Sequence, residues 1–399
     1  MKRYPAFDPP EYVDWKPEEA LLREFGETAR RDPSRRALIE ALEPESLLAL
    51  YRGLLRFRLH DIALQRWVKQ GVISKAWLGT GEEAVTIGAV HALRRDGPRG
   101  DVVGPMIRNA GACHEMGMPV ADMLRGYLAT EDSPTRGRDL HVGDLHHGIV
   151  APISMVGALA PVMNGFALAF KRRRESRVAL TWVGDGATKH GEVHEALNFA
   201  AVLRLPCVFV LQNNQVALGT RFDQHHRAAD FGAWGKAYGV PQLTADGNHV
   251  LDVFAATRLA ADRCRAGEGP VLIEALTFRM GGHATHDVQE ARRTFPALQF
   301  RRWGRRDPIG LYEEYLARGS VELAGQTEAA GETEAAGETR EDRNRRALQR
   351  AEEEVTAEVE SAAEEALRSR RERQPAPESA AEGVYAEDPS GRGREPWTP

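Results

Sequence analysis

The fold is decided by residues 178–214, which read VALTWVGDGATKHGEVHEALNFAAVLRLPCVFVLQNN. The first apolar run ends at Gly184-Asp185-Gly186, and the second, which starts at Cys207, ends at Asn213-Asn214. Between them, residues 192–203 carry apolar side chains at helical spacing. A strand, a helix and a strand within about thirty residues form a crossover unit. We therefore expect two parallel, nearly adjacent strands with both polar clusters at their carboxyl ends, where open α/β sheets bind ligands.

The two polar clusters supply atoms that a divalent cation and a diphosphate require. The Asp185 carboxylate and the Asn214 amide oxygen suit Mg²⁺, whose other ligands are commonly phosphate oxygens and water. Gly184 and Gly186 let the backbone approach a diphosphate closely, and the N–H groups of Gly186 and Ala187 can point at its oxygens. Either cluster alone is also an ordinary turn. Together, each after a buried strand, they predict a site for Mg²⁺ and a diphosphate.

The composition limits the class of protein. The 399 residues, 42% of them hydrophobic, are ample for a large core in one or two domains. A formal net charge of −5 argues against nucleic acid as a main partner. The three cysteines, Cys113, Cys207 and Cys264, show neither a disulfide framework nor zinc spacing, which fits a reducing compartment. No apolar run has the length of a signal-peptide core or a membrane span, so we expect a cytoplasmic protein without a membrane partner.

The first two of four predicted parts of the chain are an arm and a large domain. Residues 1–45 form a polar, proline-containing arm with one helix expected around residues 18–29. Such an arm either wraps a partner subunit or is loose. From a helix over residues 45–71 onward, helices and short strands alternate, and the domain extends over residues 46–320. This alternation predicts the α/β class, with a doubly wound parallel sheet and helices on both faces.

The other two parts are a linker and a tail. Residues 321–340 contain a tandem repeat of Gly, Glu, Thr and Ala, which has no apolar residue large enough for a core and predicts a mobile linker. Residues 341–399 form the tail. Its first part, residues 341–373, predicts an exposed helix with one narrow apolar stripe laid on the body or on a partner. Pro375 and Pro377 end this helix, and the rest reads as irregular.

Further motifs occur in the order of one enzyme family. They are Thr80-Gly81-Glu82-Glu83-Ala84, Ile107-Arg108, Ser154-Met155-Val156-Gly157, Gly281-Gly282-His283 and residues 303–309. With the Gly-Asp-Gly and Asn-Asn pair, which resembles the thiamine diphosphate motif, they are similar to the α subunit of the E1 component of 2-oxo acid dehydrogenase complexes. That family includes pyruvate, branched-chain 2-oxo acid and acetoin dehydrogenases. The resemblance covers about residues 45–320, extends to a tail motif at residues 383–387, and implies the thiamine diphosphate-binding fold.

The resemblance implies a set of residues for the diphosphate end of the cofactor. Mg²⁺ would be held by Asp185, by the side chain of Asn214 and by the backbone carbonyl of Val216. Gly186 and Ala187 would offer backbone contacts to the diphosphate. Arg108 would pair with diphosphate oxygens through its guanidinium fork, the alternative being a surface ion pair.

Two positions depart from the family pattern. Ile107 stands where relatives often carry a tyrosine that reaches the diphosphate, and Gln212 stands where some carry another arginine. Diphosphate binding is therefore expected to rely on Mg²⁺, Arg108, helix N-termini and Arg279.

The aminopyrimidine and the active-site loop are also implied by the resemblance. Backbone groups of Ser154 and Val156 would contact the pyrimidine, although Met155 and Val156 could instead be core residues before a helix over residues 161–170. His283 matches the family histidine that approaches the diphosphate and serves acyl transfer to the lipoyl group, the alternative being a structural role. A second histidine cluster lies on a predicted loop at the same entrance and has no assigned role. It consists of His141, His146 and His147.

The chain is too short to hold a second, pyrimidine-binding domain with the glutamate that activates the cofactor. Glu82 and Glu83 are the only local substitutes, and a structural role suits them better. The resemblance therefore implies an E1 β subunit in an α2β2 tetramer with the cofactor at the interface. The expected activity is oxidative decarboxylation of a small 2-oxo acid, branched-chain or pyruvate, with reductive acylation of lipoylated E2. An acetoin dehydrogenase α subunit and a non-catalytic paralogue, given Ile107, Gln212 and Val216, are the alternatives.

Overall fold

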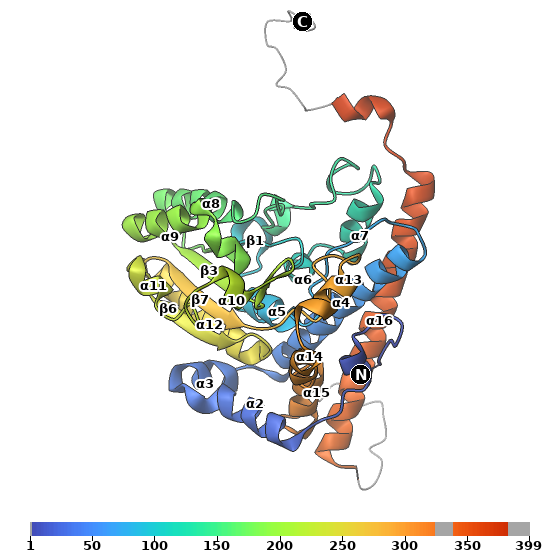
Figure 1. Cartoon of the computed structure of the whole chain (residues 1–399), viewed down its shortest axis with the longest axis horizontal. Helices are drawn as coiled ribbons and strands as arrows, with labels where there is room; N and C mark the ends of the chain where they lie inside the picture. Colours follow the sequence, from blue (N-terminus) through green and yellow to red (C-terminus); the bar gives the residue numbers. More distant parts are fainter. Residues whose placement is uncertain (1, 324–337, 382–399) are drawn as a thin grey trace, which may run out of the picture.

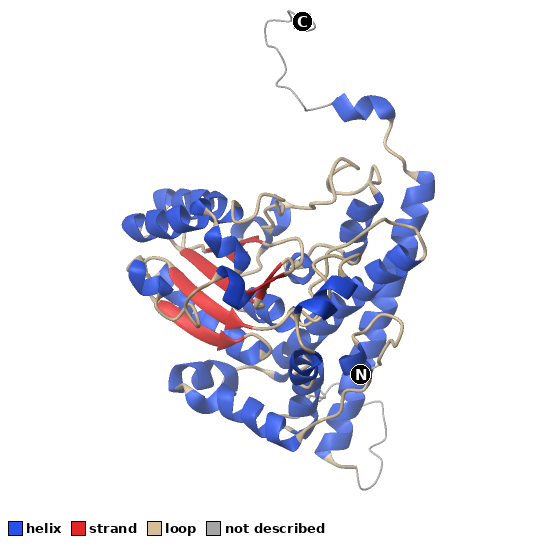
Figure 2. Ribbon diagram, viewed as in Figure 1, coloured by secondary structure: helices blue, strands red, loops and turns tan. Residues whose placement is uncertain are grey.

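The centre of the structure, a computed structural model describing residues 2–323 and 338–381, is a parallel sheet between helices (Figures 1 and 2). Its five strands follow the order β1-β2-β3-β7-β6, and every neighbouring pair is parallel. The strands are β1 Val102–Gly104, β2 Ala179–Gly184, β3 Cys207–Asn213, β6 Gln242–Asp246 and β7 Val271–Leu276. A small antiparallel hairpin is formed by β4 Val216–Ala217 and β5 Thr220–Arg221. The predicted doubly wound α/β fold is confirmed.

The helices alternate with these strands and extend beyond them at both ends of the chain. Up to β2 they are α1 Pro10–Val13, α2 Glu19–Arg31, α3 Pro33–Glu40, α4 Pro44–Lys69, α5 Glu83–His91, α6 Ala110–Glu115, α7 Val120–Leu128 and α8 Leu159–Arg173. After β2 they are α9 Gly191–Leu203, α10 Phe222–His225, α11 Trp234–Ala237, α12 Val250–Arg265, α13 Val288–Thr294, α14 Ala297–Gly304, α15 Pro308–Arg318 and α16 Arg340–Glu372. Short 3₁₀ turns are η1 Gly97–Arg99, η2 Leu145–His147, η3 Gly186–Lys189 and η4 Pro377–Ala381.

The sheet is buried on both faces, which explains why its strands read as continuous apolar runs. Successive side chains of a strand point to opposite faces. Leu180 and Trp182 of β2 therefore join one apolar core, and Ala179 and Val183 of the same strand join the other. Helices α8 and α9 cover the second face, where Figure 1 shows them side by side.

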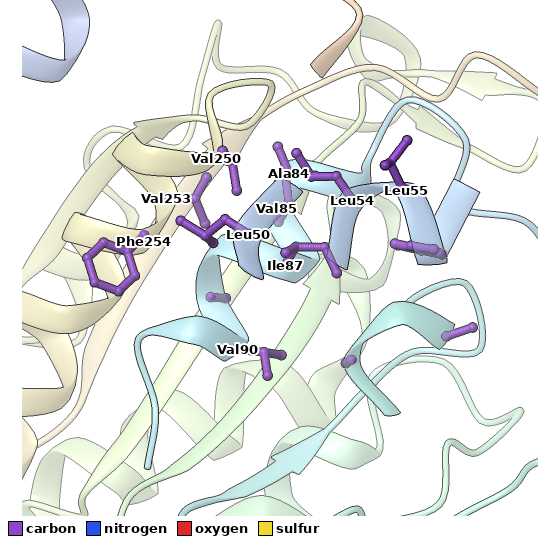
Figure 3. Packing of buried hydrophobic residues seen from close by; sticks show 14 of the residues in the cluster. Leu50, Leu54, Leu55, Ala84, Val85, Ile87, Val90, Val250, Val253 and Phe254 are labelled. Carbon is purple, nitrogen blue, oxygen red and sulfur yellow. The ribbon is translucent and has the colours of Figure 1, made fainter. Parts of the chain in front are cut away.

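The larger core holds α5 between α4 and α12. Figure 3 shows Leu50, Leu54 and Leu55 of α4 packed with residues of the two other helices. A side chain at Gly88 would bring its Cβ within 2.5 Å of the Val250 carbonyl oxygen, so α5 and α12 approach closely only because this residue is glycine. This packing fixes the N-terminus of α5, where Glu82 lies.

The predicted crossover unit is present. Helix α9 connects β2 to β3, and the two strands are direct neighbours with Gly184 opposite Gln212. On the other side of β3, Asn213 lies opposite Leu276 of β7. The carboxyl ends of β2, β3 and β7 therefore meet at one edge of the sheet.

The N-terminal arm differs from the prediction, because it has three helices rather than one and packs on the body of the chain. Helix α2 matches the expected helix. Its Phe25 stacks on His249, the N-cap of α12, with ring centroids 3.4 Å apart, and Arg35 of α3 forms an ion pair of 2.7 Å with Asp252. Tyr12 of α1 is fully buried. The arm is thus part of the folded body.

The C-terminal helix α16 is also packed more closely than predicted. It lies along α4 and α7 on one side of the molecule (Figure 1). Its apolar stripe contains Leu348, Val355 and Val359, and it is wider than predicted because buried alanines with small side chains extend it. These are Ala347, Ala351, Ala362, Ala363 and Ala366.

Ion pairs add to this packing. Arg52, Arg56 and Arg66 of α4 pair with Glu354, Glu358 and Glu360 at 2.9, 2.8 and 2.6 Å. Most of the predicted linker, residues 324–337, and the tail motif at residues 383–387 lie outside the described residues. The boundaries between the four predicted parts of the chain stay predictions.

Candidate functional site

Loops that follow four adjacent strands converge at the carboxyl edge of the sheet. The loop after β1 carries Arg108, the loop after β2 carries Asp185, the loop after β3 carries Asn214, and the loop after β7 carries Arg279 and His283. Each of these side chains except His283 is less than a tenth exposed. The topology thus brings together residues that are up to 175 positions apart in the chain.

Three oxygen atoms that could bind a metal ion lie at the ends of β2 and β3. Asp185 follows Gly184, and a Cβ at the next residue, Gly186, would overlap Ala217 of the hairpin, so the Gly-Asp-Gly turn lies directly against residues 214–217. The Asn214 amide oxygen accepts from the Val216 N–H at 3.3 Å. In the hairpin, the Phe222 N–H donates to the Gln215 carbonyl. The next pair, Val216 and Arg221, is therefore a non-hydrogen-bonded pair of the antiparallel ladder. As a result, the Val216 carbonyl points away from the partner strand.

Glu82 lies at the centre of a buried network of polar side chains next to these oxygen atoms. It is fully buried at the N-cap of α5. Its carboxylate accepts from Asn214 Nδ2 at 2.8 Å and from Gln212 Nε2 at 2.5 Å, and it lies 3.4 Å from Arg108 Nη1. Gln212 in turn accepts from Asn109 Nδ2 at 2.9 Å. Glu82 therefore directs the nitrogen of the Asn214 amide toward itself and the oxygen away.

Two guanidinium groups approach one imidazole. Arg108 Nη2 lies 3.0 Å and Arg279 Nη1 lies 3.4 Å from Nδ1 of His283. Arg279 Nη2 also donates to the Leu218 carbonyl at 2.8 Å, which ties the loop after β7 to the tip of the hairpin. Burial and the Arg108 charge lower the pKa of Arg279 to about 10. Burial, followed by the charges of Arg108 and Arg279, lowers the pKa of His283 to about 4.

The predicted pyrimidine loop lies at the rim of this site. Met155 and Val156 are 66% and 53% exposed, which rules out the alternative that they are core residues. A Cβ at Gly157 would lie 3.6 Å from the Ala187 carbonyl and 2.8 Å from Val193, so the loop borders the turn that follows Asp185. An exposed apolar rim beside a buried polar site is a surface that a partner could cover.

The second histidine cluster joins this rim through one of its members. His141 Nε2 lies 3.1 Å from Ser154 Oγ, and its Nδ1 lies 2.7 Å from Asp139 Oδ1. The carboxylate therefore orients the imidazole toward Ser154. His146 and His147 contact each other and Asp144 instead, on the 3₁₀ turn η2.

Sequence reasoning missed three functional candidates. Glu82 was expected to be structural, although its position in the Thr80–Ala84 motif was a signal. His141 was left without a role. His225 was not considered. It lies on α10, and its Nε2 donates to Asp185 Oδ2 at 3.2 Å. No local sequence pattern predicts this contact.

The residues fit a hard cation and an anionic ligand. Within the described residues no group of three or more His, Cys, Asp or Glu could hold a metal, so a cation here would rest on one carboxylate and neutral oxygens. The oxygen-only donors Asp185, Asn214 and Val216 match Mg²⁺. Two buried guanidinium groups that repel each other, at Arg108 and Arg279, match a phosphate group. The predicted roles of the site residues stay predictions.

Comparisons with known proteins show the family of the chain. Residues 52–360 match the family described as dehydrogenase E1 component. The chain is 34% identical over 282 residues to the 3-methyl-2-oxobutanoate dehydrogenase subunit alpha of Mycobacterium tuberculosis. The aligned region covers 69% of this chain and 71% of the relative. The chain is 31% identical over 278 residues to the 2-oxoisovalerate dehydrogenase subunit alpha of Bacillus subtilis, with 69% and 83% covered. The pyruvate dehydrogenase E1 component subunit alpha of Acholeplasma laidlawii is 31% identical over 295 residues, with 71% and 80% covered.

The chain therefore belongs to the dehydrogenase E1 component family, as an α subunit of the 2-oxo acid dehydrogenase type. The family resemblance seen in the sequence is confirmed, and the family implies thiamine diphosphate as the cofactor. None of the helices in the described ranges 2–323 and 338–381 is both long and apolar enough to cross a membrane.

Proposed function

We propose that this chain is the E1 α subunit of a complex that oxidatively decarboxylates a small 2-oxo acid and reductively acylates the lipoyl group of E2. Branched-chain 2-oxo acids and pyruvate are the substrate classes named by the relatives. The chain would bind thiamine diphosphate and Mg²⁺ and act with a β subunit in an α2β2 tetramer. A cytoplasmic location remains part of the proposal.

One observation carries the proposal, namely that Arg108 and Arg279 converge on His283 beside the oxygen donors at the ends of β2 and β3. Three carboxylates act on the Arg279 charge, namely the buried Glu82 and Asp185 and the partly exposed Asp287. They offset the charges of Arg108 and Arg279. A divalent cation would add two positive charges, so the site would then need an anion with several charges, as a diphosphate has.

The residues of this chain would divide the work of binding. Asp185, Asn214 and the Val216 carbonyl would hold Mg²⁺, with Gly186 and Ala187 offering backbone N–H groups to the diphosphate. Arg108 and Arg279 would bind phosphate oxygens. Backbone groups of Ser154 and Val156 would hold the aminopyrimidine. When bound, the cofactor supplies the electron sink for decarboxylation.

His283 would act as an acid or base near the reacting groups. Its Nδ1 accepts from the two arginines, so the proton of the neutral ring resides on Nε2. His141, held by Asp139, is a second imidazole on the rim that could exchange a proton at Ser154.

A β subunit would complete the site. The rim formed by Ser154, Met155 and Val156 is exposed although it borders buried site residues. The carboxylic acid that activates the cofactor would come from the partner, because Glu82 is already committed to Arg108, Gln212 and Asn214.

The proposal is tested by reconstituting the chain with its β subunit. Turnover is measured with an artificial electron acceptor, with Mg²⁺ and thiamine diphosphate, against pyruvate, three branched-chain 2-oxo acids and acetoin. We expect turnover of at least one 2-oxo acid by the pair and none by the isolated chain. Decarboxylation by the α chain alone, free of β subunit by mass spectrometry, contradicts the two-subunit proposal. Turnover of acetoin alone identifies the acetoin enzyme instead, and no turnover with any substrate supports a non-catalytic paralogue.

A further inference from the structure

The segment that leaves β7 presents side chains to two different environments. Phe278 and Met280 are buried in an apolar cluster, while Arg279 between them reaches Leu218 and His283 in the site. This is the alternation of an extended chain. Whatever holds Phe278 and Met280 in place therefore also sets where the Arg279 guanidinium lies.

The apolar cluster is completed by the N-terminal arm. Its buried members are Tyr12, Phe278, Met280, Phe300 and Trp303. The Phe278 ring stacks on Trp303 with centroids 5.8 Å apart and meets Phe300 edge-on at 5.3 Å. Tyr12, fully buried, is the arm's contribution, although it lies 266 or more positions before the others. Without its ring the cluster beneath Arg279 would contain a cavity.

The residue before Tyr12 holds the other end of the loop. Glu11 forms a two-pronged ion pair with Arg292 of α13, at 2.6 and 2.9 Å. The Arg292 guanidinium also lies 4.0 Å above the Phe300 ring. A Cβ at Gly304 would overlap Glu11, so helix α14 must carry glycine there for the arm to lie so close. Two consecutive arm residues thus contact the segments before and after His283.

The tip of the loop is not held by the arm in this way. A groove of about 600 Å³ separates the loop from arm residues 6–10 and from α4. Gly281, Gly282 and Thr285 line this groove. The arm therefore fixes the two ends of the loop and leaves room beside its tip.

Tyr12 contributes its ring and not its hydroxyl. Within the described residues its Oη has no hydrogen-bond partner, and burial raises its pKa well above the ordinary value, so the hydroxyl stays neutral. The ring lies 4.7 Å below the guanidinium of Arg58, which is itself paired with Asp307 at 3.1 Å. Phenylalanine would preserve both the packing and this cation–π contact.

We propose that Tyr12 and Glu11 are positioning residues for Arg279, and that the arm thereby controls the affinity of the site for its diphosphate ligand. Tyr12 acts by filling the cluster under Phe278 and Met280, and Glu11 acts by holding α13 through Arg292. This inference rests on the proposed function, because it takes Arg279 to be a diphosphate ligand.

The test is a double-mutant cycle in the reconstituted α/β complex, with the dissociation constant for thiamine diphosphate measured by calorimetry at saturating Mg²⁺. Tyr12→Ala is expected to weaken binding at least tenfold, and Tyr12→Phe is expected to stay within twofold of the parent. In an Arg279→Ala background, Tyr12→Ala should change the affinity by less than threefold, because the group it positions is gone. A purely structural role would weaken binding equally in both backgrounds and would overturn the proposal.

A second pair of variants keeps the test valid if Tyr12→Ala does not assemble. Glu11→Arg faces Arg292 with a like charge and should weaken binding about fivefold or more, and the swap Glu11→Arg with Arg292→Glu should restore it to within about twofold. Glu19→Arg is the matched control, because Glu19 forms an arm ion pair of 2.6 Å with Arg318, away from the loop. Equal losses for Glu11→Arg and Glu19→Arg, or no rescue by the swap, would refute the inference. Arg279→Ala reports separately on the proposed function, since full affinity in that variant removes Arg279 from the diphosphate site.

Discussion

Arg108 donates from Nη2 to Nδ1 of His283 at 3.0 Å, so this imidazole is an acceptor in the resting protein. A protonated ring could not accept this bond, because both of its nitrogens would carry hydrogen. Arg279 Nη1, at 3.4 Å from the same atom, favours the neutral ring further. The contacts at Nδ1 and the low pKa of about 4 both indicate a neutral imidazole, because the ring is buried beside two guanidinium groups.

We predict that His283 makes stability depend on pH below neutrality. In the unfolded chain histidine has a pKa of about 6.5, and in the folded protein the pKa of His283 is about 4. Between these pH values the unfolded state binds more protons than the folded state. The free energy of unfolding therefore has its full value, as far as His283 is concerned, above about pH 6.5 and decreases as the pH falls toward 4. Thermal unfolding of the cofactor-free α/β complex should lose less stability from pH 7 to pH 5 in His283→Gln than in the parent. Identical pH profiles would show that His283 is not held neutral.

We predict that Glu82→Gln weakens Mg²⁺ binding about ten- to a hundredfold. The substitution leaves one acceptor oxygen for donors at Arg108, Gln212 and Asn214, so the Asn214 amide loses its orientation. A lost hydrogen bond to a charged group is worth about 1.5–3 kcal/mol, or roughly ten- to a hundredfold. Mg²⁺ titration of the complex at fixed thiamine diphosphate measures the effect. Glu268→Gln, in an exposed pair with Arg263, is the control and should leave the titration unchanged.

We predict that Gly186→Ala disrupts the Gly-Asp-Gly turn and that Ala217→Gly repairs it. The new Cβ would overlap the Cβ of Ala217, and removal of that methyl group leaves the backbone Cα of residue 217 as the nearest atom, at 3.1 Å. Overpacking of this kind costs about 1–3 kcal/mol, so cofactor affinity should fall about five- to a hundredfold in the single variant. Recovery of most of this loss in the double variant is expected. A double variant as weak as Gly186→Ala would mean that the glycine is needed for its backbone and not for space.

We predict that His283→Ala separates cofactor binding from acyl transfer. Affinity for Mg²⁺ and thiamine diphosphate should stay within about tenfold, which is about 1.4 kcal/mol. Activity of the complete complex with lipoylated E2 should fall about 10²–10⁴-fold, as for a lost acid or base. Comparison of activity with an artificial acceptor and with lipoyl domain decides the role. Equal losses in both assays would exclude a lipoyl-specific role, and no loss in either would make the histidine structural.

The sheet and the two polar clusters were predictable because their signals are local. The apolar runs at residues 178–183 and 207–211 are buried on both faces of the sheet, and the helix between them shows its own periodicity. Their pairing follows from the short crossover. These elements therefore appear in the structure within one or two residues of their predicted limits.

The polar network was not predictable, because its contacts join distant parts of the chain. Glu82 accepts a hydrogen bond from Gln212, which lies 130 positions further along the chain. Gln212 departs from the family pattern, in which some relatives carry an arginine, and this hydrogen bond is the contact that the neutral side chain makes with Glu82. His225 reaches Asp185 from a short helix with no apolar periodicity. The other buried members of the cluster that Tyr12 joins lie beyond position 277, so nothing in residues 1–45 showed that the arm packs on the body.

The central claim is that Asp185 holds Mg²⁺ for the diphosphate of the cofactor, and calorimetry of the α/β complex with thiamine diphosphate and Mg²⁺ tests it most directly. Asp185→Ala removes the charged oxygen ligand and leaves a small side chain at a position where Asp185 now contacts His225. We predict that binding becomes too weak to measure, while the variant still assembles with the β subunit. Binding of thiamine diphosphate and Mg²⁺ by Asp185→Ala as tightly as by the parent would contradict the assignment of the whole site.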